Sequence, residues 1–234
     1  MFIKYRNYIL LTAVLFMFPT CIEKIGSANS RTGNEAYLNW EYFHLHGELA
    51  EFRAFSQGIA RYGEIIRQES EKQGWDWRLI AAIVFRESGF NPKACSPAGA
   101  TGLMQLMPGT LLSYGINNAT DPAQNIRGGL RMLNWLNEQY TKEIPDYQER
   151  IKFILASYNT GYSRLHEARK MAARMGKNPD IWDDHVEFVF SDQCRALNRP
   201  VPGQNSRPCG SEETYDFVRS VLDYYNRFLA FLPY

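Results

Sequence analysis

A single glutamate, Glu87, occupies a position where a carboxyl group is unusually able to keep its proton. It falls in the last turn of an apolar helix that is expected to begin after Asp76. The helix dipole is negative at this end, and the apolar neighbours Val84 and Phe85 exclude water, so both effects raise a carboxyl pKa. A glutamic acid that stays protonated near neutral pH can donate a proton to a glycosidic oxygen. By itself, however, a glutamate at a helix end is more often a solvated residue.

The segment that follows Glu87 makes the catalytic interpretation much stronger. Glycines and prolines predict loops over residues 89–109. Within this stretch, Glu-Ser-Gly-Phe-Asn-Pro (87–92) and Ser-Pro-Ala-Gly-Ala-Thr-Gly-Leu-Met-Gln-Leu-Met-Pro (96–108) resemble the signature of the SLT-domain lytic transglycosylases. Ala-Ser-Tyr-Asn-Thr-Gly (156–161) resembles a second family element, and Glu-Thr-Tyr-Asp-Phe-Val (213–218) more loosely resembles a third. The resemblance spans roughly residues 70–230 and implies a goose-lysozyme-like fold.

The resemblance also implies a reaction on peptidoglycan. In this family the glutamate protonates the oxygen between N-acetylmuramic acid and N-acetylglucosamine, and then accepts the proton of the muramic C6 hydroxyl, which closes a 1,6-anhydro ring. Because the nucleophile belongs to the substrate, the enzyme needs neither a positioned water nor a second carboxylate to activate one. Glu87 would therefore serve as acid and then as base.

Substrate-binding roles carry over by position to Ser96, Met104, Gln105, Tyr158, Asn159 and Glu213. Ser96 and Gln105 would hydrogen-bond the muramic residue, and Met104 would form an apolar wall for a sugar face. Tyr158 would orient Glu87 or the acetamido group, with Asn159 supporting it. Structural interpretations remain open for several of them: Met104 as core, and the Tyr158–Asn159 pair as an ordinary helix end. A glutamate in a first helical turn, like Glu213, is also favourable on dipole grounds alone.

Other classes of function find little support. The net charge of +1 provides no general attraction for nucleic acid. No Cys-x-x-Cys pair or helical histidine pair is present, and His44 and His46 are two residues apart, so no metal site or cofactor is expected. The two rivals are a hydrolase on the same fold, such as a goose-type lysozyme, and a non-catalytic glycan-binding module. We expect a monomer.

The N-terminal segment resembles a secretory signal. Lys4 and Arg6 precede an apolar run over residues 9–18, which is too short to span a bilayer as a helix. We therefore expect export to the periplasm. Two processing routes remain open: lipidation at Cys21, which would anchor the protein to the outer membrane, and ordinary cleavage after Ala28.

The cysteines outside this segment are three in number, so they cannot all pair. Cys194 and Cys209 bracket a proline-rich loop, and closing about 15 residues is worth on the order of 3 kcal/mol. We predict a disulfide between these two, with Cys95 as a passive small residue.

Apolar residues recur at helical spacing while strand-like alternation is scarce, so the chain is predicted to be mainly α, a lysozyme-like helical domain with an optional short β-hairpin after the catalytic helix. The expected organisation is a signal segment with a short linker (1–30), an N-terminal helical extension (31–73) and the catalytic domain (74–234). Helices are expected over residues 35–56, 59–72, 77–88, from 122, over 148–160, after 163 and after 211. The expected inward-facing residues are Trp77, Ile80, Ala81, Val84 and Phe85; Ile126, Leu130, Leu133 and Leu136; and Val218, Leu222, Tyr225 and Leu229.

Overall fold

The computed structural model describes residues 34–191 and 211–231, with side chains described over residues 50–191 and 211–230. Cys21, Ala28, Cys194 and Cys209 lie outside these ranges, so the processing routes and the disulfide stay predictions. The chain divides into two compact units, Met1–Glu51 and Phe52–Tyr234. The site lies in the second unit. The proposed division of the chain at residues 73 and 74 also stays a prediction.

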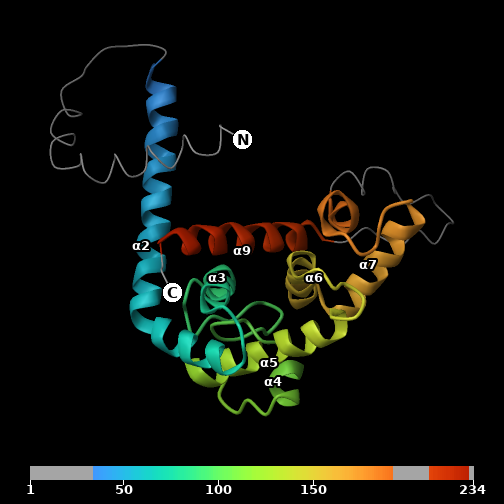
Figure 1. Ribbon diagram of the computed structural model, residues 1–234. Coiled ribbons are helices and arrows are strands. Elements are labelled where there is room, and N and C mark those ends of the chain that lie inside the picture. Colours follow the sequence, from blue (N-terminus) through green and yellow to red (C-terminus); the bar gives the residue numbers. More distant parts are fainter. Residues whose placement is uncertain (1–33, 192–210, 232–234) are drawn as a thin grey trace. The chain divides into compact units, whose positions relative to one another are not determined.

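The described residues are mainly helical, as predicted (Figure 1). The elements in chain order are α2 (Asn34–Lys72), α3 (Trp77–Ser88), α4 (Pro108–Ser113), α5 (Pro122–Tyr140), α6 (Tyr147–Thr160), α7 (Tyr162–Arg174), η2 (Trp182–Val186), η3 (Glu187–Phe190) and α9 (Glu212–Phe231). After α3, the described chain forms two isolated antiparallel bridges, Cys95 with Thr101 and Thr101 with Leu106, instead of a hairpin. Within these ranges, no helix has the length and apolar character needed to cross a bilayer.

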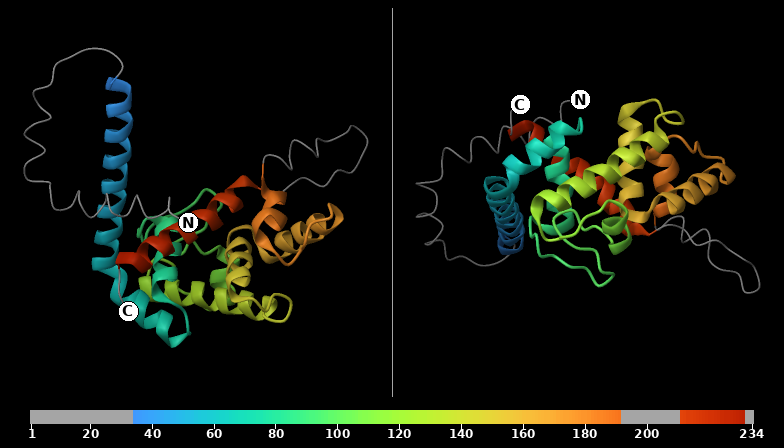
Figure 2. Two further views of the ribbon diagram at one scale, coloured as in Figure 1. Left: turned by 45° about the horizontal axis from the view of Figure 1, so that its top comes forward. Right: turned by 90° about the horizontal axis from the view of Figure 1, so that it is seen from below.

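Helix α3 is the centre of the second unit. It begins at Asp76, whose carboxylate accepts a hydrogen bond from the backbone N–H of Arg78, as expected for an N-cap. We predicted one buried stripe, but every residue from Trp77 to Val84 is buried, while Phe85 is only partly so. A helix that is apolar on all sides is one that other elements surround. Helix α9 packs on both α3 and α6, and α5 packs on α6 (Figures 1 and 2).

The inward face of α5 is as predicted, whereas that of α9 is predicted only in part. The four predicted α5 residues are all fully buried. In α9 the predicted Val218 is buried, and Leu222 and Tyr225 are partly buried against the core, but Leu229 is 39% exposed. Phe217, Val221 and Phe228, which we did not predict to face inward, are buried. Apolar residues fill two neighbouring rows of α9, so periodicity alone did not decide which row contacts α3.

Helix α2 is continuous, although the sequence predicted two helices separated near Gly58. A Cβ atom on Gly58 would lie 2.1 Å from Cδ2 of Phe90. The glycine thus lets the Phe90 ring press against the helix backbone instead of ending the helix. The Phe55 ring, one turn earlier, stacks on Phe228 of α9 with centroids 3.6 Å apart.

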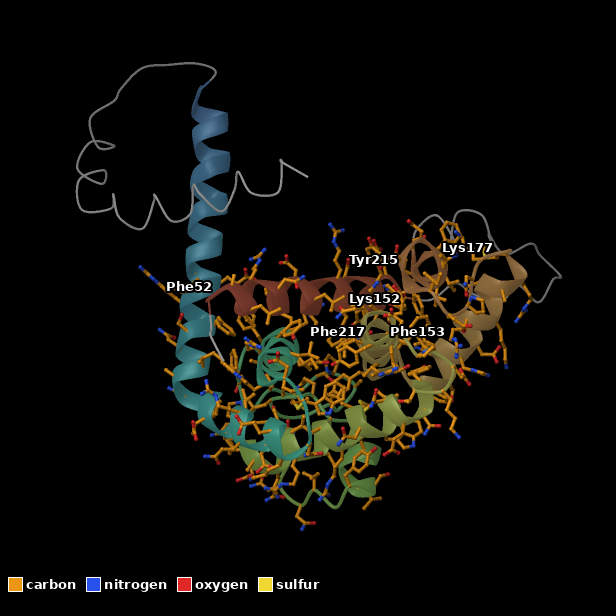
Figure 3. All side chains as sticks on the ribbon, viewed as in Figure 1. Phe52, Lys152, Phe153, Lys177, Tyr215 and Phe217 are labelled. Carbon is orange, nitrogen blue, oxygen red and sulfur yellow. The ribbon has the colours of Figure 1, made fainter. Side chains whose placement is uncertain are left out.

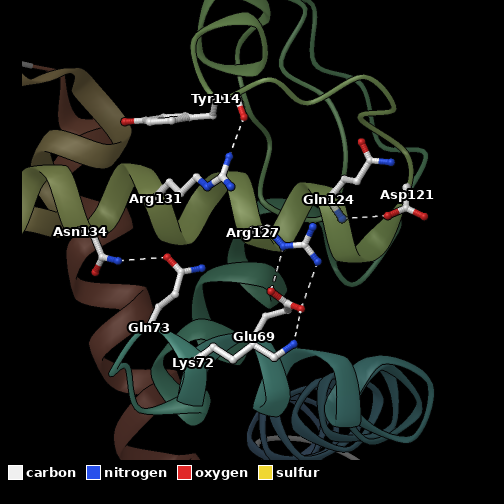
Figure 4. Close-up of polar contacts among 9 residues, drawn as sticks. All are labelled: Glu69, Lys72, Gln73, Tyr114, Asp121, Gln124, Arg127, Arg131 and Asn134. Carbon is white, nitrogen blue, oxygen red and sulfur yellow. Dashed lines mark hydrogen bonds and ion pairs between the residues drawn. The ribbon is translucent and has the colours of Figure 1, made fainter.

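Polar contacts join the end of α2 to α5 (Figure 4). The buried carboxylate of Glu69 accepts hydrogen bonds from Nε and Nη2 of Arg127 and from Nζ of Lys72. The hydrogen bond from Arg127 is the largest cause that holds the pKa of Glu69 below its usual value. Gln73 accepts a hydrogen bond from Asn134 at 3.0 Å. These contacts hold α5 in place beneath the loop that follows α3.

We predict that Gly58→Ala lowers the free energy of unfolding by about 1–3 kcal/mol, because the added methyl group must displace the Phe90 ring. Urea unfolding at neutral pH measures the change. Gly109→Ala in α4 is the matched control, since a Cβ there meets no atom within 4 Å and alanine favours a helix. Equal stability of the Gly58 variant and the wild type would contradict the proposed contact.

Candidate active site

Glu87 lies in the last turn of α3, as predicted. The helix ends at Gly89, which has a left-handed φ of 57° and donates its N–H to the carbonyl of Phe85. Such a conformation suits glycine, and it terminates a helix. The next residue, Phe90, also has a positive φ of 63°, which is unusual for a phenylalanine. The burial of its ring against Phe55 and Phe85 holds this backbone in place.

The environment of Glu87 favours the protonated acid. Burial is the main cause that raises the pKa of Glu87 to about 8, the charge of Arg86 opposes the shift, and the charge of Glu213 adds to it. No residue in the described parts of the chain forms a hydrogen bond or an ion pair with this carboxyl group. The sequence indicated the direction of the shift. A second carboxylate near enough to influence Glu87 was not expected.

Ser88 fastens the end of α3 to the signature loop, residues 89–107. Its hydroxyl donates to the carbonyl oxygens of Val84, at 3.1 Å, and of Leu103, at 2.8 Å. Because Leu103 is itself fully buried, the loop is fixed at the point where it passes the end of α3.

Asn125 of α5 holds the same loop from the other side, and sequence reasoning missed it. Its Oδ1 accepts a hydrogen bond from the backbone N–H of Met104 at 2.7 Å, and its Nδ2 donates to the carbonyls of Thr101 and Ala119. A Cβ on Gly102, which has a φ of 90°, would lie 2.2 Å from this amide nitrogen. An asparagine among the inward positions of an apolar helix is a signal that could have identified it, because a buried amide must find partners.

Gln105 and Ser96 lie within the signature loop and form contacts inside it. Gln105 has a positive φ of 47°, and its Nε2 donates to the carbonyls of Ala94 and Gly102. The hydroxyl of Ser96 accepts a hydrogen bond from the backbone N–H of Ala100 at 3.0 Å. Both side chains are partly exposed. They shape the loop, and their binding of a muramic residue stays a prediction.

Met104 lies in the core in this structure. Its side chain is 0% exposed, and a Cβ added to Gly129 of α5 would come within 2.3 Å of its sulfur. The thioether therefore contacts protein, which agrees with the structural alternative. Its predicted role as a sugar wall stays a prediction, and Met104 would have to become exposed to fulfil it.

Tyr158, near the end of α6, lies behind the acid. Its hydroxyl donates to the carbonyl of Met104 at 2.6 Å, and its ring stacks on Phe217 with centroids 6.4 Å apart. Burial, followed by the negative charge of Glu87, raises the pKa of Tyr158 well above its usual value. Tyr158 is therefore close enough to interact electrostatically with Glu87. The hydroxyl proton of Tyr158 is already engaged in the hydrogen bond to the signature loop.

Asn159 connects α6 to the beginning of α9. Its Oδ1 accepts a hydrogen bond from the hydroxyl of Thr214 at 2.8 Å, and Thr214 is buried. This contact places the exposed Glu213 at the edge of the site, in the first turn of α9. Phe217, one turn further, extends inward from α9 (Figure 3), and the guanidinium of Arg86 lies over its ring.

The structure thus brings the three sequence motifs together: the end of α3 with its loop, the end of α6, and the start of α9. Cys95 lies in the signature loop as an exposed free thiol. Across the described ranges, no group of three or more histidine, cysteine, aspartate or glutamate residues is arranged to hold a metal ion. The chemistry available at this site is that of a single protonated carboxyl group with an acidic neighbour.

We predict that Asn125→Ala lowers the free energy of unfolding by about 2–5 kcal/mol, because it leaves the buried N–H of Met104 and two carbonyls without partners. Asn125→Asp keeps the acceptor for Met104 and loses both donors, so it should reveal what the donors contribute. Asn117→Ala, at an exposed position, is the control. Thermal and urea unfolding measure all three, and a neutral Asn125→Ala would show that the loop does not depend on this amide.

Comparison with known proteins agrees with this geometry. The model of the transglycosylase SLT domain matches residues 64–181. Membrane-bound lytic murein transglycosylase F of Alcanivorax borkumensis is 35% identical over 210 residues, covering 87% of this chain and 43% of the relative. The protein of the same name from Shewanella pealeana is 40% identical over 203 residues, covering 84% and 41%.

The chain therefore spans less than half the length of these curated relatives. Among solved structures, the soluble lytic transglycosylase SLT70 of Escherichia coli is 23% identical with a TM-score of 0.46, covering 73% of this chain and 24% of that one. The domain match extends over half of the chain and includes the catalytic helix, the signature loop and the end of α6. On this ground, the chain belongs to the transglycosylase SLT domain family.

Proposed function

We propose that this protein cleaves the β-1,4 bond between N-acetylmuramic acid and N-acetylglucosamine in peptidoglycan and leaves 1,6-anhydromuramic ends. The observation that carries the proposal is the position of Glu87: a partly buried carboxyl group without hydrogen-bond partners in the described structure, with a pKa of about 8, directly before the signature loop. Membership of the SLT family and the names of the relatives support the choice of substrate.

The first step uses the proton that burial keeps on Glu87. With a pKa of about 8, the carboxyl group is mostly protonated at neutral pH, so it can protonate the glycosidic oxygen as the bond to C1 breaks. The resulting carboxylate is a stronger base than an ordinary carboxylate, because the burial that disfavours its ionisation also favours its taking up a proton. It takes the proton of the muramic C6 hydroxyl, whose oxygen bonds to C1, and Glu87 returns to its starting state.

The loop and the end of α6 would position the sugar for this sequence. Ser96 and Gln105 are partly exposed in the loop that follows the acid, and their remaining hydrogen-bonding capacity suits the hydroxyl and acetamido groups of the muramic residue. Because the C6 hydroxyl is tethered to the reacting ring, holding that ring in one orientation replaces the capture of water. No metal or cofactor takes part in the proposed reaction.

One observation favours a second candidate, hydrolysis of the same bond. The charge of Glu213 reaches Glu87, so the site contains a second carboxylate. In an inverting glycosidase, a second carboxylate activates the attacking water. Glu213 is exposed at the edge of the site, where it is equally suited to bind a sugar hydroxyl. The two candidates differ in their products, since hydrolysis leaves reducing muramic ends.

We further propose an envelope location, in which the protein acts from the periplasm on the peptidoglycan layer. The basic residues and apolar run that precede Cys21 support export, and the relatives are named as membrane-bound. A lipid on Cys21 would attach the protein to the outer membrane, while cleavage after Ala28 would release it. We also propose that it acts as a monomer.

Digestion of purified sacculi tests the reaction. We expect the wild type to release fragments with 1,6-anhydromuramic ends, and Glu87→Gln to lower turnover by about 10²–10⁴-fold, because glutamine has no proton to donate. Mass spectrometry of the fragments measures both. Glu213→Gln is the matched control and should leave the anhydro product as the main one. Exclusively reducing muramic ends would replace the proposed lyase with a hydrolase, and comparable turnover by the Glu87 variant would assign the acid to another residue.

The pH dependence of the activity follows from the raised pKa of Glu87. Activity requires protonated Glu87, so it should fall as the pH rises through about 8. In Glu213→Gln the repulsion is removed, the pKa of Glu87 decreases, and the alkaline limb moves to lower pH. Arg86→Gln should move it to higher pH. Profiles of kcat/KM on soluble glycan strands measure the limbs, and unchanged limbs in both variants would exclude this electrostatic coupling.

The raised pKa of Glu87 also makes the stability of the fold depend on pH. An unfolded glutamate ionises near pH 4.3, whereas Glu87 in the folded protein ionises near 8, so the wild type loses stability relative to Glu87→Gln as the pH rises between these values. The difference should be constant above the upper value. Thermal unfolding over this pH range checks the direction independently of any activity.

A further inference from the structure

Trp135 of α5 is a large aromatic residue on the surface, 41% exposed. Trp135 makes an edge-to-face contact with Tyr162 of α7, with ring centroids 5.3 Å apart and ring planes at 72°. Tyr162 in turn lies almost parallel to His166, at 6.3 Å and 17°. These three residues, which we call the aromatic row, form one ordered arrangement across two helices.

The aromatic row is anchored to the core. The ring of Tyr162 packs against the buried Tyr140, with centroids 5.6 Å apart. The hydroxyl of Tyr140 shares a buried hydrogen bond of 2.7 Å with that of Ser157 on α6. A ligand that contacts the row therefore meets rings whose orientation is already determined, so little side-chain entropy is lost on binding.

Polar groups flank the exposed tryptophan. Arg131 and Glu138 lie four residues before and three residues after Trp135, which places all three on the same face of α5. Arg131 donates to the carbonyl of Tyr114 at 2.8 Å (Figure 4). Burial and then the charge of Glu138 raise the pKa of Tyr114, so its phenol lies near that carboxylate. Flat rings beside charged and hydroxyl groups suit a sugar, whose apolar faces carry hydroxyl groups at the rim.

The two segments beside this surface both start at the active site. Helix α4 follows the signature loop directly after Met107, and Tyr114 is the residue that caps its end. Helix α7 begins at Tyr162, four residues after Tyr158 and directly after Gly161. Tyr162 of the aromatic row therefore follows the end of α6 directly, and the hydrogen bond from Arg131 to Tyr114 joins the face of α5 that carries Trp135 to the segment that follows the signature loop.

We propose that the aromatic row, with Trp135 as its principal contact, is an additional glycan-binding subsite that stacks a sugar ring of the same strand at a distance from the bond that is cut. The inference rests on the proposed function, because the occupant is a peptidoglycan strand. The subsite would give the protein a preference for long strands over short fragments, since only a long strand can occupy it and the catalytic site together.

The test uses the full chain with Glu87→Gln to prevent cleavage, and adds Trp135→Ala. Binding is measured by isothermal titration with two probes: long glycan strands freed of peptides, and a fragment of two disaccharide units. We expect Trp135→Ala to weaken binding of long strands by about tenfold, as for the loss of one stacked ring, and binding of the short fragment by less than about twofold. Trp135→Phe should restore most of the affinity.

Tyr147→Ala is the matched control. Tyr147 is also an exposed aromatic residue, but it lies near Asp76, at the opposite end of α3 from Glu87. It should leave the binding of both probes unchanged. Equal binding of long strands with and without Trp135, in variants that melt like the parent, would overturn the subsite. Failure of the Glu87 variant itself to bind either probe would instead contradict the proposed function.

Discussion

The burial of a carboxyl group at the end of α3 is the constraint on which the rest of the site depends. Other helices surround α3, so its last turn is partly desolvated, and Glu87 has no partner in the described structure to offset the loss of water. A charge in such a place is costly, and the group keeps its proton instead. The same cost makes the ionised form a strong base. Both proposed roles of Glu87 therefore follow from one packing arrangement.

The loop after α3 can remain close to this carboxyl group only because its backbone is held from several sides. Ser88 holds Leu103, Asn125 holds the N–H of Met104, and Tyr158 holds the carbonyl of Met104. Three polar side chains on three helices thus satisfy backbone groups that would otherwise be buried without partners. Several residues that resemble substrate ligands in the sequence motifs hold the loop in the structure. Holding the loop and binding the substrate are separate roles, and one sequence motif can contain residues for both.

The contact between α6 and α9 defines the other edge of the site. The hydrogen bond between Asn159 and Thr214 and the stacking of Tyr158 on Phe217 place the first turn of α9 beside the acid. Through this contact, Glu213 influences a carboxyl group that is distant from it in the sequence. The balance between Arg86 and Glu213 therefore adjusts how tightly Glu87 keeps its proton. Burial provides most of the shift, and the two charges modify it.

The sequence by itself determined the helical class, the start of α3 at Asp76 and the inward face of α5, and it predicted Glu87 as the acid. These features depend on local spacing and residue type, which a linear pattern contains. The continuity of α2 across Gly58, the burial of Phe217 and Val221 on α9, and the hydrogen bonds of the Asn125 amide to the signature loop were decided by the tertiary structure. Each depends on which distant surface comes into contact: the Phe90 ring, the side of α3, or the backbone of the signature loop. The environment of Glu87 depends on both the sequence and the tertiary structure. The sequence pattern places the carboxyl group at a helix end, and the packing of other helices desolvates it.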